Sequence, residues 1–203
     1  MRNDHGVAAE RGGRRKVEVR ETVRLFDDFF SIDQSLVRYE RFDGAMSPTV
    51  RLLTFERGDA VAGVVVNRDT GEALLVEQFR FATYRKGDGW VVELVAGMIE
   101  PGEEPEAVMR REVLEEIGYQ VGAVEPLGVF YLSPGGSSER IFLFYAEVTN
   151  ADRVASGGGL AEEGENVRLT SIPVADVGDA LDDGLIHDAK TIIGLMWLRA
   201  RTG

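Results

Sequence analysis

The chain contains no cysteine among its 203 residues. This absence excludes disulfide bonds and thiolate chemistry, and it is typical of a protein that works in a reducing cytoplasm. No apolar run approaches the roughly 18 residues of a membrane-spanning helix, so we expect no membrane segment. Residues 1–16 lack the apolar core of a secretory signal, and we expect them to form a disordered leader.

Basic residues are few relative to acidic ones. The sequence has 23 Lys and Arg against 35 Asp and Glu, which gives a net charge of −12. This balance argues against nonspecific binding to nucleic acid, which needs a basic surface. It also makes an anionic substrate difficult to bind unless metal ions intervene. With 44% hydrophobic residues, the chain has an ordinary globular composition, sufficient for one domain or one domain with a small appendage.

Residues 17–57 form the first expected unit. The segments 16–26, 29–42 and 49–56 show partial alternation of apolar and polar residues with β-branched and aromatic side chains, which predicts strands. A β meander of this size buries little and leaves exposed edges. We therefore expect it to pack on the remainder of the chain or on a second copy.

The rest of the chain reads mainly as strands, followed by two helices at the C-terminal end. Apolar runs bounded by turn residues predict the strands, and apolar residues at helical spacing predict the helices. The predicted strands are 60–66, 72–79, 90–97, 121–132, 140–148 and 167–173, and the predicted helices are 174–184 and 187–201.

The segment 96–119 reads AGMIEPGEEPEAVMRREVLEEIGY and contains a further helix. Proline suits the first helical turn and glycine the end, so we place the helix between Pro105 and Gly118. Three glutamates at i, i+3 and i+4 share one face, although like charges at that spacing destabilise a helix. A hard cation such as Mg²⁺ would explain them, and a solvated acidic face is the alternative. The glutamates are Glu112, Glu115 and Glu116, with Ala107, Val113, Leu114 and Ile117 expected on the broadly opposite side, buried against a sheet.

The spacing of this segment resembles the Nudix box. The matching positions are Gly97, Glu103, Arg111-Glu112, the aliphatic Val113, Glu115-Glu116 and Gly118, whereas Tyr119 stands where the family prefers an aliphatic residue.

The surrounding sequence is similar to the ADP-ribose and nucleoside-diphosphate-sugar pyrophosphatases within the Nudix hydrolases, over roughly residues 17–200. The similarity rests on RGDAVAGVVV, VEQFR, the marker Pro134 in YLSPGGSSER and the tail DAKTIIGLMWL. It implies an α/β/α sandwich around a mixed sheet, joined to an N-terminal antiparallel β unit. The implied organisation is a leader over 1–16, a dimerisation unit over 17–57 and a Nudix domain over 58–203, in an intertwined homodimer.

The resemblance also implies a metal site. Glu112 and Glu116 would ligate Mg²⁺, or Mn²⁺ instead, together with the backbone carbonyl of Ala96. Glu115 would be a further ligand or a neighbour of the ligands, and Arg111 would orient the carboxylates. Gly97 would let the chain turn tightly beside the metal. Glu103 is expected to pair with Arg111, with a weak metal contact as the alternative.

The general base is expected in the loop GGGLAEEGENV, beyond the sheet. Alignment by resemblance places the base at Glu163 and a further metal ligand, arriving on closure, at Glu165. Glu162 is the rival base, because an alignment through a glycine run can slip by one residue. The glycines at 157–159 would let the loop move, and the alternative is an acidic surface loop without a role.

Several residues are expected to contact the substrate. Arg80 follows a predicted strand and either grips a substrate anion with two parallel hydrogen bonds or is a surface charge. Phe30 and Tyr39 could stack on a base, with core packing as the alternative for each. The full set of predicted substrate contacts is Arg57, Arg80, Met98, Gly135, Gly136 and Glu139.

The function implied is Mg²⁺-dependent hydrolysis of the pyrophosphate bond of a nucleoside diphosphate sugar. ADP-ribose, cut to AMP and ribose 5-phosphate, is the first expected substrate. GDP-mannose or another nucleotide sugar is the alternative, and an inactive Nudix domain that senses a ligand is a different class. We expect a cytoplasmic enzyme without nucleic-acid or membrane partners.

Overall fold

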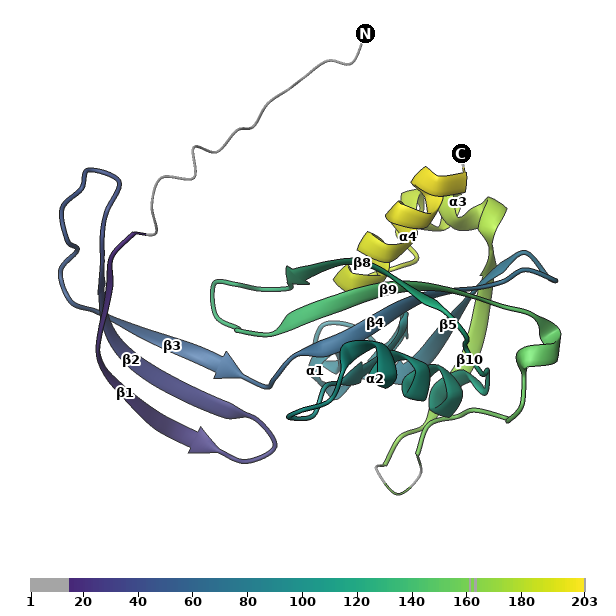
Figure 1. The fold of residues 1–203 in the computed structure, drawn as a ribbon, viewed down its shortest axis with the longest axis horizontal. Helices are drawn as coiled ribbons and strands as arrows, with labels where there is room; N and C mark the ends of the chain where they lie inside the picture. Colours follow the sequence, from purple (N-terminus) through teal and green to yellow (C-terminus); the bar gives the residue numbers. More distant parts are fainter. Residues whose placement is uncertain (1–14, 161, 163, 203) are drawn as a thin grey trace, which may run out of the picture. The chain divides into compact units, whose positions relative to one another are not determined.

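The computed structural model describes residues 15–160, 162 and 164–202. The chain forms two compact units, each described here by itself (Figure 1). The described part of the first unit comprises residues 15–57 and Gly135–Ser138, and that of the second comprises Gly58–Pro134 and the described residues from Glu139 onward. Among the residues described, no helix is long and apolar enough to cross a membrane.

The first unit is a three-stranded antiparallel sheet in the order β1-β2-β3, as its alternating sequence predicts. The strands are β1 (Val17–Asp27), β2 (Ser31–Tyr39) and β3 (Val50–Glu56). Every residue of β1 is exposed. The segment Gly135–Ser138 lies on β3, where Phe55 N–H donates to the carbonyl oxygen of Gly136 at 2.7 Å. This placement of a distant segment was not predicted from the sequence.

The second unit is built on a mixed seven-stranded sheet with the main order β10-β5-β4-β9-β8. Among its described strands, only β4 and β9 pair in parallel. The strands are β4 (Ala60–Asn67), β5 (Glu72–Phe79), β8 (Val124–Tyr131), β9 (Arg140–Val148) and β10 (Val167–Pro173).

The predicted strand 90–97 is in fact two strands, β6 (Trp90–Glu93) and β7 (Val95–Met98). β6 pairs with the end of β5, while β7 pairs with the start of β4. Because β4 and β5 stay paired only through Val65–Asn67 and Glu72–Leu74, the sheet divides beyond that point, and β6 and β7 occupy the division. A short helix, α1 (Phe81–Tyr84), precedes β6 and was not predicted.

Helices cover both faces of the sheet in the second unit, which confirms the expected sandwich (Figure 1). Side chains of β4 alternate between two cores: Val61 and Val65 pack with the α2 side, and Val64 and Val66 with the α4 side. The elements on the first side are α2 (Pro105–Glu112) and a π-helical turn, η1 (Val113–Ile117), and those on the second are η4 (Val174–Asp176), α3 (Val177–Asp182) and α4 (Ala189–Thr202).

Candidate active site

The acidic helix starts and ends where the sequence predicts. Pro105 occupies its first turn, and Gly118 ends it in the left-handed conformation with φ 79°. Its second half, however, is the π-helical turn η1 rather than an α-helix. Single π-helical turns occur frequently at functional sites, because they reposition the side chains around them.

The expected division of this helix into an acidic face and an opposite apolar face is wrong. Glu112 is 8% exposed and Glu116 2% exposed, on the same buried side as Val113 and Ile117. Successive helical residues are about 100° apart, so a glutamate and its following aliphatic neighbour can both face the sheet. The expected burial of Leu114, which is 39% exposed, and of Ala107 is also wrong.

Both buried glutamates contact strand β7. The Ala96 N–H donates to Oε2 of Glu116 at 3.1 Å. A Cβ on Gly97 would overlap the carboxyl group of Glu112. Gly97 is therefore required because Glu112 lies against it in a strand, and not because the chain turns tightly there. The expected carbonyl ligand Ala96 and the expected substrate contact Met98 both belong to this strand.

Burial changes the acidity of both glutamates. It raises the pKa of Glu116 to about 8, and the negative charges of Glu112 and Glu165 add to the effect of burial. Burial also raises the pKa of Glu112, although the adjacent Arg111 opposes the shift. Two carboxyl groups out of water and close to further carboxylates favour protons or a bound cation over free negative charge.

Arg111 connects the acidic residues of the helix. Its Nη1 donates to Glu103, which is the expected pairing, and its Nη2 donates to Oε1 of Glu112 at 3.2 Å. Its Nε lies 3.9 Å from Oε2 of Glu115. Glu103 also accepts a hydrogen bond from the Glu100 N–H at 2.9 Å, which fixes the turn before the helix. Arg111 thus fixes the positions of Glu103, Glu112 and Glu115 relative to one another.

The glycine-rich loop begins by packing against the end of the acidic helix. Gly158 N–H and Gly159 N–H donate to the carbonyl oxygens of Glu116 and Glu115, at 2.9 and 3.0 Å. Glu165 folds back to accept the Leu160 N–H at 2.9 Å. Its charge raises the pKa of both Glu112 and Glu116, so the structure brings this expected ligand within electrostatic range of them. The expected base Glu163 lies outside the described residues, and its rival Glu162 is exposed.

Arg80 is engaged by a protein carboxylate that the sequence analysis did not single out. Its Nε and Nη2 donate to Oε2 of Glu93 at 2.9 and 2.7 Å, and Lys190 Nζ donates to Oε1 at 3.0 Å. Glu93 and Lys190 are buried, at 5% and 8% exposed. A glutamate in the apolar run WVVELVAG and a lysine in the apolar helix AKTIIGLMWL were the available signals.

The remaining expected substrate contacts are distributed between the two units. Glu139 belongs to the second unit and is half-buried. Arg57, Gly135 and Gly136 belong to the first. Phe30 contacts Phe55 with ring centroids 4.7 Å apart, and its side chain stays 39% exposed.

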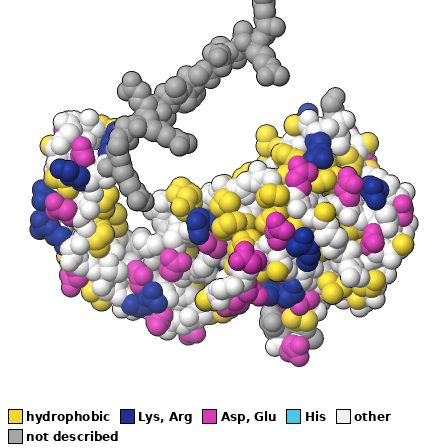
Figure 2. Space-filling view, viewed as in Figure 1, with side chains coloured by type: hydrophobic (Ala, Val, Ile, Leu, Met, Phe, Trp, Pro, Cys, Tyr) yellow, Lys and Arg dark blue, Asp and Glu magenta, His cyan; other side chains and the backbone are white. Residues whose placement is uncertain are grey.

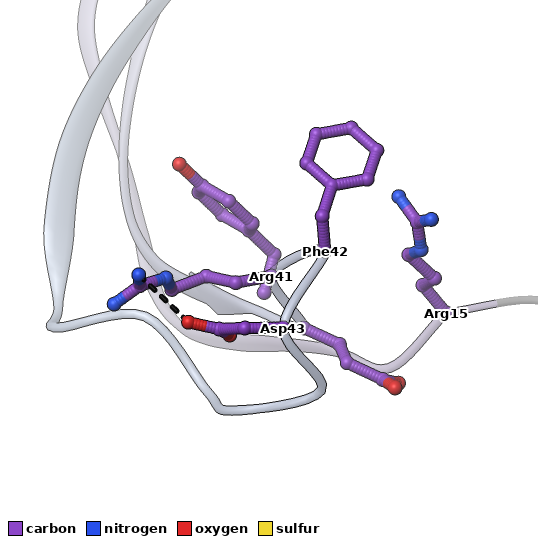
Figure 3. A pocket seen from close by; sticks show the side chains of 6 residues that line it. Arg15, Arg41, Phe42 and Asp43 are labelled. Atoms are coloured by element: carbon purple, nitrogen blue, oxygen red, sulfur yellow. Dashed lines mark ion pairs between the residues drawn. The ribbon is translucent and has the colours of Figure 1, made fainter.

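The first unit also carries an open depression of about 610 Å³ (Figure 3). The Arg15 guanidinium lies 4.2 Å from the centre of the Phe42 ring, and Arg41 pairs with Asp43 at 2.8 Å. Tyr39 also lines this depression. The two arginines already have protein partners, and the depression holds no cluster of buried carboxylates like that of the second unit.

The donors of the candidate site suit a hard divalent cation. The expected ligands are carboxylate oxygens together with the backbone carbonyl of Ala96, the ligand type that Mg²⁺ and Mn²⁺ prefer. Among the residues described, Arg111 is the cation that hydrogen-bonds to the buried pair, through Glu112, and the charge of Arg80 lowers the pKa of Glu116 against the effect of burial. Within the described ranges, no three acidic or histidine side chains converge closely enough to hold an ion as they stand. On the visible face in Figure 2, acidic and basic side chains are interspersed.

Comparison with known proteins identifies relatives of this chain. Residues 56–193 match the family model described as NUDIX domain. The chain is 38% identical over 188 residues to a protein named ADP-ribose pyrophosphatase from Escherichia coli strain K12, covering 92% of this chain and 90% of the relative. It is 35% identical over 187 residues to a protein named GDP-mannose pyrophosphatase from Cronobacter sakazakii, covering 91% and 96%. A solved structure titled as an ADP compounds hydrolase has a similar fold, with a TM-score of 0.70 at 18% identity over 94% of this chain and 98% of that one.

Proposed function

The chain belongs to the NUDIX family of pyrophosphatases, and from this premise we propose that it hydrolyses ADP-ribose to AMP and ribose 5-phosphate with the help of Mg²⁺. The observation that carries the proposal is the pair of buried glutamates that the acidic helix packs against β7. Glu112 lies against Gly97, and Glu116 accepts the Ala96 N–H. Burying two carboxylates costs free energy when no cation is bound, and the same pair can hold a cation beside a diphosphate.

In the proposed reaction, a water oxygen attacks one phosphorus of the diphosphate, and the bond from that phosphorus to the bridging oxygen breaks. A bound divalent cation supplies charge neutralisation at the phosphoryl oxygens and lowers the pKa of water. Glu112, Glu116, Glu165 and the Ala96 carbonyl are the residues proposed to hold it. Arg111 keeps the carboxylates oriented, and Glu115 stands beside them.

The general base is proposed to be Glu163, which would take the proton of the attacking water. The neighbouring Glu165 supports this assignment, because its loop is hydrogen-bonded through Gly158 and Gly159 to the carbonyl oxygens of Glu116 and Glu115 in η1. The remaining proposed substrate contacts are Arg57, Arg80, Met98, Gly135, Gly136 and Glu139.

A second candidate substrate is GDP-mannose, favoured by the 35% identity to an enzyme of that name over 91% of the chain. The chemistry at the diphosphate would be the same. The two candidates differ in the base and sugar, and the glutamate pair, which would act at the shared diphosphate, does not distinguish them.

A substrate panel tests the proposal. ADP-ribose, GDP-mannose, NADH and a diadenosine polyphosphate are incubated with the protein and Mg²⁺, and the products are identified by mass. We expect AMP and ribose 5-phosphate from ADP-ribose at the highest kcat/KM. A higher kcat/KM for GDP-mannose would replace ADP-ribose as the substrate, and no turnover of any of the four would contradict the proposal.

We also propose that two copies associate through the first unit. Its strand β1 is exposed along its whole length, with Val17 and Val19 each 63% exposed and Leu25 52% exposed. Exposed apolar strands favour pairing with another chain. Light scattering of the full chain should give a dimer, and the double substitution Val19→Glu with Leu25→Glu should give a monomer. The control Arg20→Gln should remain a dimer. If the double variant also remains a dimer, the interface does not lie on β1. A cytoplasmic location stays a prediction.

A further inference from the structure

A buried ion cluster lies beside the active site but outside the acidic helix. Its centre is Glu93, whose Oε2 accepts hydrogen bonds from Arg80 and, at 3.1 Å, from Gln78 Nε2, while Oε1 accepts from Lys190. The side chains of Lys190 and Glu93 are 10% and 7% exposed. Buried ion pairs of this kind add little net stability, because desolvation offsets their attraction. We therefore ask whether the cluster fixes the conformation of the Arg80 side chain.

Arg80 is held by one edge of its guanidinium and left available on the other. Nε and Nη2 both point at the same oxygen of Glu93, and Nη1 has no hydrogen-bond partner among the residues that the structure describes. The Arg80 side chain is 43% exposed. Glu93 stands three residues before Ala96, whose N–H donates to Oε2 of Glu116, so Arg80 is bound to the segment that leads into the candidate site.

Lys190 is itself held in place at the start of α4. Its Nζ lies 3.1 Å from Oδ1 of Asp188. The other oxygen of Asp188 accepts the Thr191 N–H at 2.9 Å and the Thr191 hydroxyl at 2.6 Å, as a helix-capping residue does. Thr191 Oγ1 in turn accepts the Leu94 N–H at 2.8 Å. The first turn of α4 thus grips both Glu93 and Leu94.

We infer that Lys190 is a positioning residue for the substrate: it fixes Glu93, and Glu93 fixes Arg80 so that the free Nη1 edge meets an anionic oxygen of the substrate. Arginine suits this arrangement because its donors form a planar fork, with one side bound to the protein carboxylate and the other to phosphate. The inference rests on the proposed function for the identity of the anion.

Kinetics of four single variants and one double variant test this inference. Lys190→Met removes the ammonium and keeps the chain length, and it should raise KM for ADP-ribose about tenfold with kcat changed less than about twofold, because an equal loss of ground-state and transition-state binding changes only KM. Lys190→Arg should restore KM to within about threefold of the unaltered protein. In an Arg80→Gln background, Lys190→Met should add no further rise, and Arg199→Met, on the same helix, should change neither constant.

Loss of the buried ammonium could unfold the protein, so a second variant removes both charges. Glu93→Gln combined with Lys190→Met leaves no unpaired charge at Oε1, and it should fold and show the same rise in KM. A folded double variant with an unaltered KM would overturn the inference. So would a rise of equal size in the Arg80→Gln background, since the effect would then not pass through Arg80.

A measurement without turnover separates this inference from the proposed function. The Nε–H of Arg80, observed by NMR in the ¹⁵N-labelled protein, should exchange with solvent at least about tenfold faster in Lys190→Met than in the unaltered protein or in Lys190→Arg. If the exchange rate of the Arg80 Nε–H is unchanged in Lys190→Met, the positioning role of Lys190 is wrong, whatever the substrate. If exchange responds as expected while no nucleotide sugar is hydrolysed, the proposed function fails and the coupling of Lys190 to Arg80 stands.

Discussion

The carboxyl group of Glu112 occupies the space beside the Cα of Gly97 that a Cβ would fill in any other residue. Strand β7 and the acidic helix therefore approach each other as closely as a glycine allows. The contact is made by the far end of a flexible side chain, so a larger residue would displace the carboxyl group rather than the backbone.

Gly97→Ala should consequently damage activity more than stability. We expect kcat/KM to fall roughly a hundredfold, comparable to loss of one preorganised polar group, while the free energy of unfolding changes by less than about 1 kcal/mol. Kinetics over a Mg²⁺ titration and urea unfolding measure the two effects. Gly122→Ala is the matched control, because a Cβ there meets nothing within 4 Å. Equal activities of the two variants would remove the role of the close contact.

Replacement of either buried glutamate by glutamine should nearly abolish turnover while the fold persists. Glutamine keeps the shape, and at position 116 it can still accept the Ala96 N–H, but it cannot supply a negative oxygen to a cation. We expect kcat to fall by roughly a thousandfold or more in Glu112→Gln and in Glu116→Gln. Glu106→Gln, on the exposed side of α2, is the control. Retention of most activity in both active-site variants would eliminate the metal assignment.

The stability of the metal-free protein should fall as pH rises. The pKa of Glu116 is about 8 in the folded protein, against an ordinary value of 4.5. Between these values the folded state holds a proton that the unfolded chain has lost. The contribution is therefore complete below pH 4.5 and lost as pH rises through about 8, at up to about 1.4 kcal/mol per pH unit.

Urea unfolding in EDTA from pH 5 to 9 measures this dependence. Glu116→Gln should abolish most of the slope, since glutamine does not titrate. Added Mg²⁺ should stabilise the protein increasingly toward high pH, because the cation binds the deprotonated carboxyl group and releases its proton. Identical slopes for the variant and the unaltered protein would show that another group is responsible.

The loop beyond η1 offers a separate test of the general base. Glu163→Gln should lower kcat by roughly a hundred- to thousandfold with little change in the Mg²⁺ concentration required for half-maximal rate. Glu165→Gln should instead raise that concentration. If Glu162→Gln reproduces the result expected for Glu163→Gln, the alignment of the loop is displaced by one residue.

The sequence was sufficient to predict most elements because their signals are local. Alternating apolar residues marked the strands of the first unit, apolar runs between turn residues marked those of the second, and Pro105 and Gly118 bounded the acidic helix. The orientation of Glu112 and Glu116 was misjudged, because helical spacing says which residues are neighbours but not which side meets the sheet. The cluster of Glu93, Arg80 and Lys190 joins residues far apart in the chain, and Arg80 and Lys190 are separated by 110 positions. Only the fold brings such residues together.

The same cluster has a consequence for the order in which the site is built. The Leu94 N–H and the Glu93 carboxylate find their partners in Thr191 and Lys190, 97 positions later in the chain. These contacts, made where β6 leads into β7, cannot form until the first turn of α4 has been synthesised and has docked. The working centre is therefore completed only after α4 docks, although its two glutamates are translated much earlier.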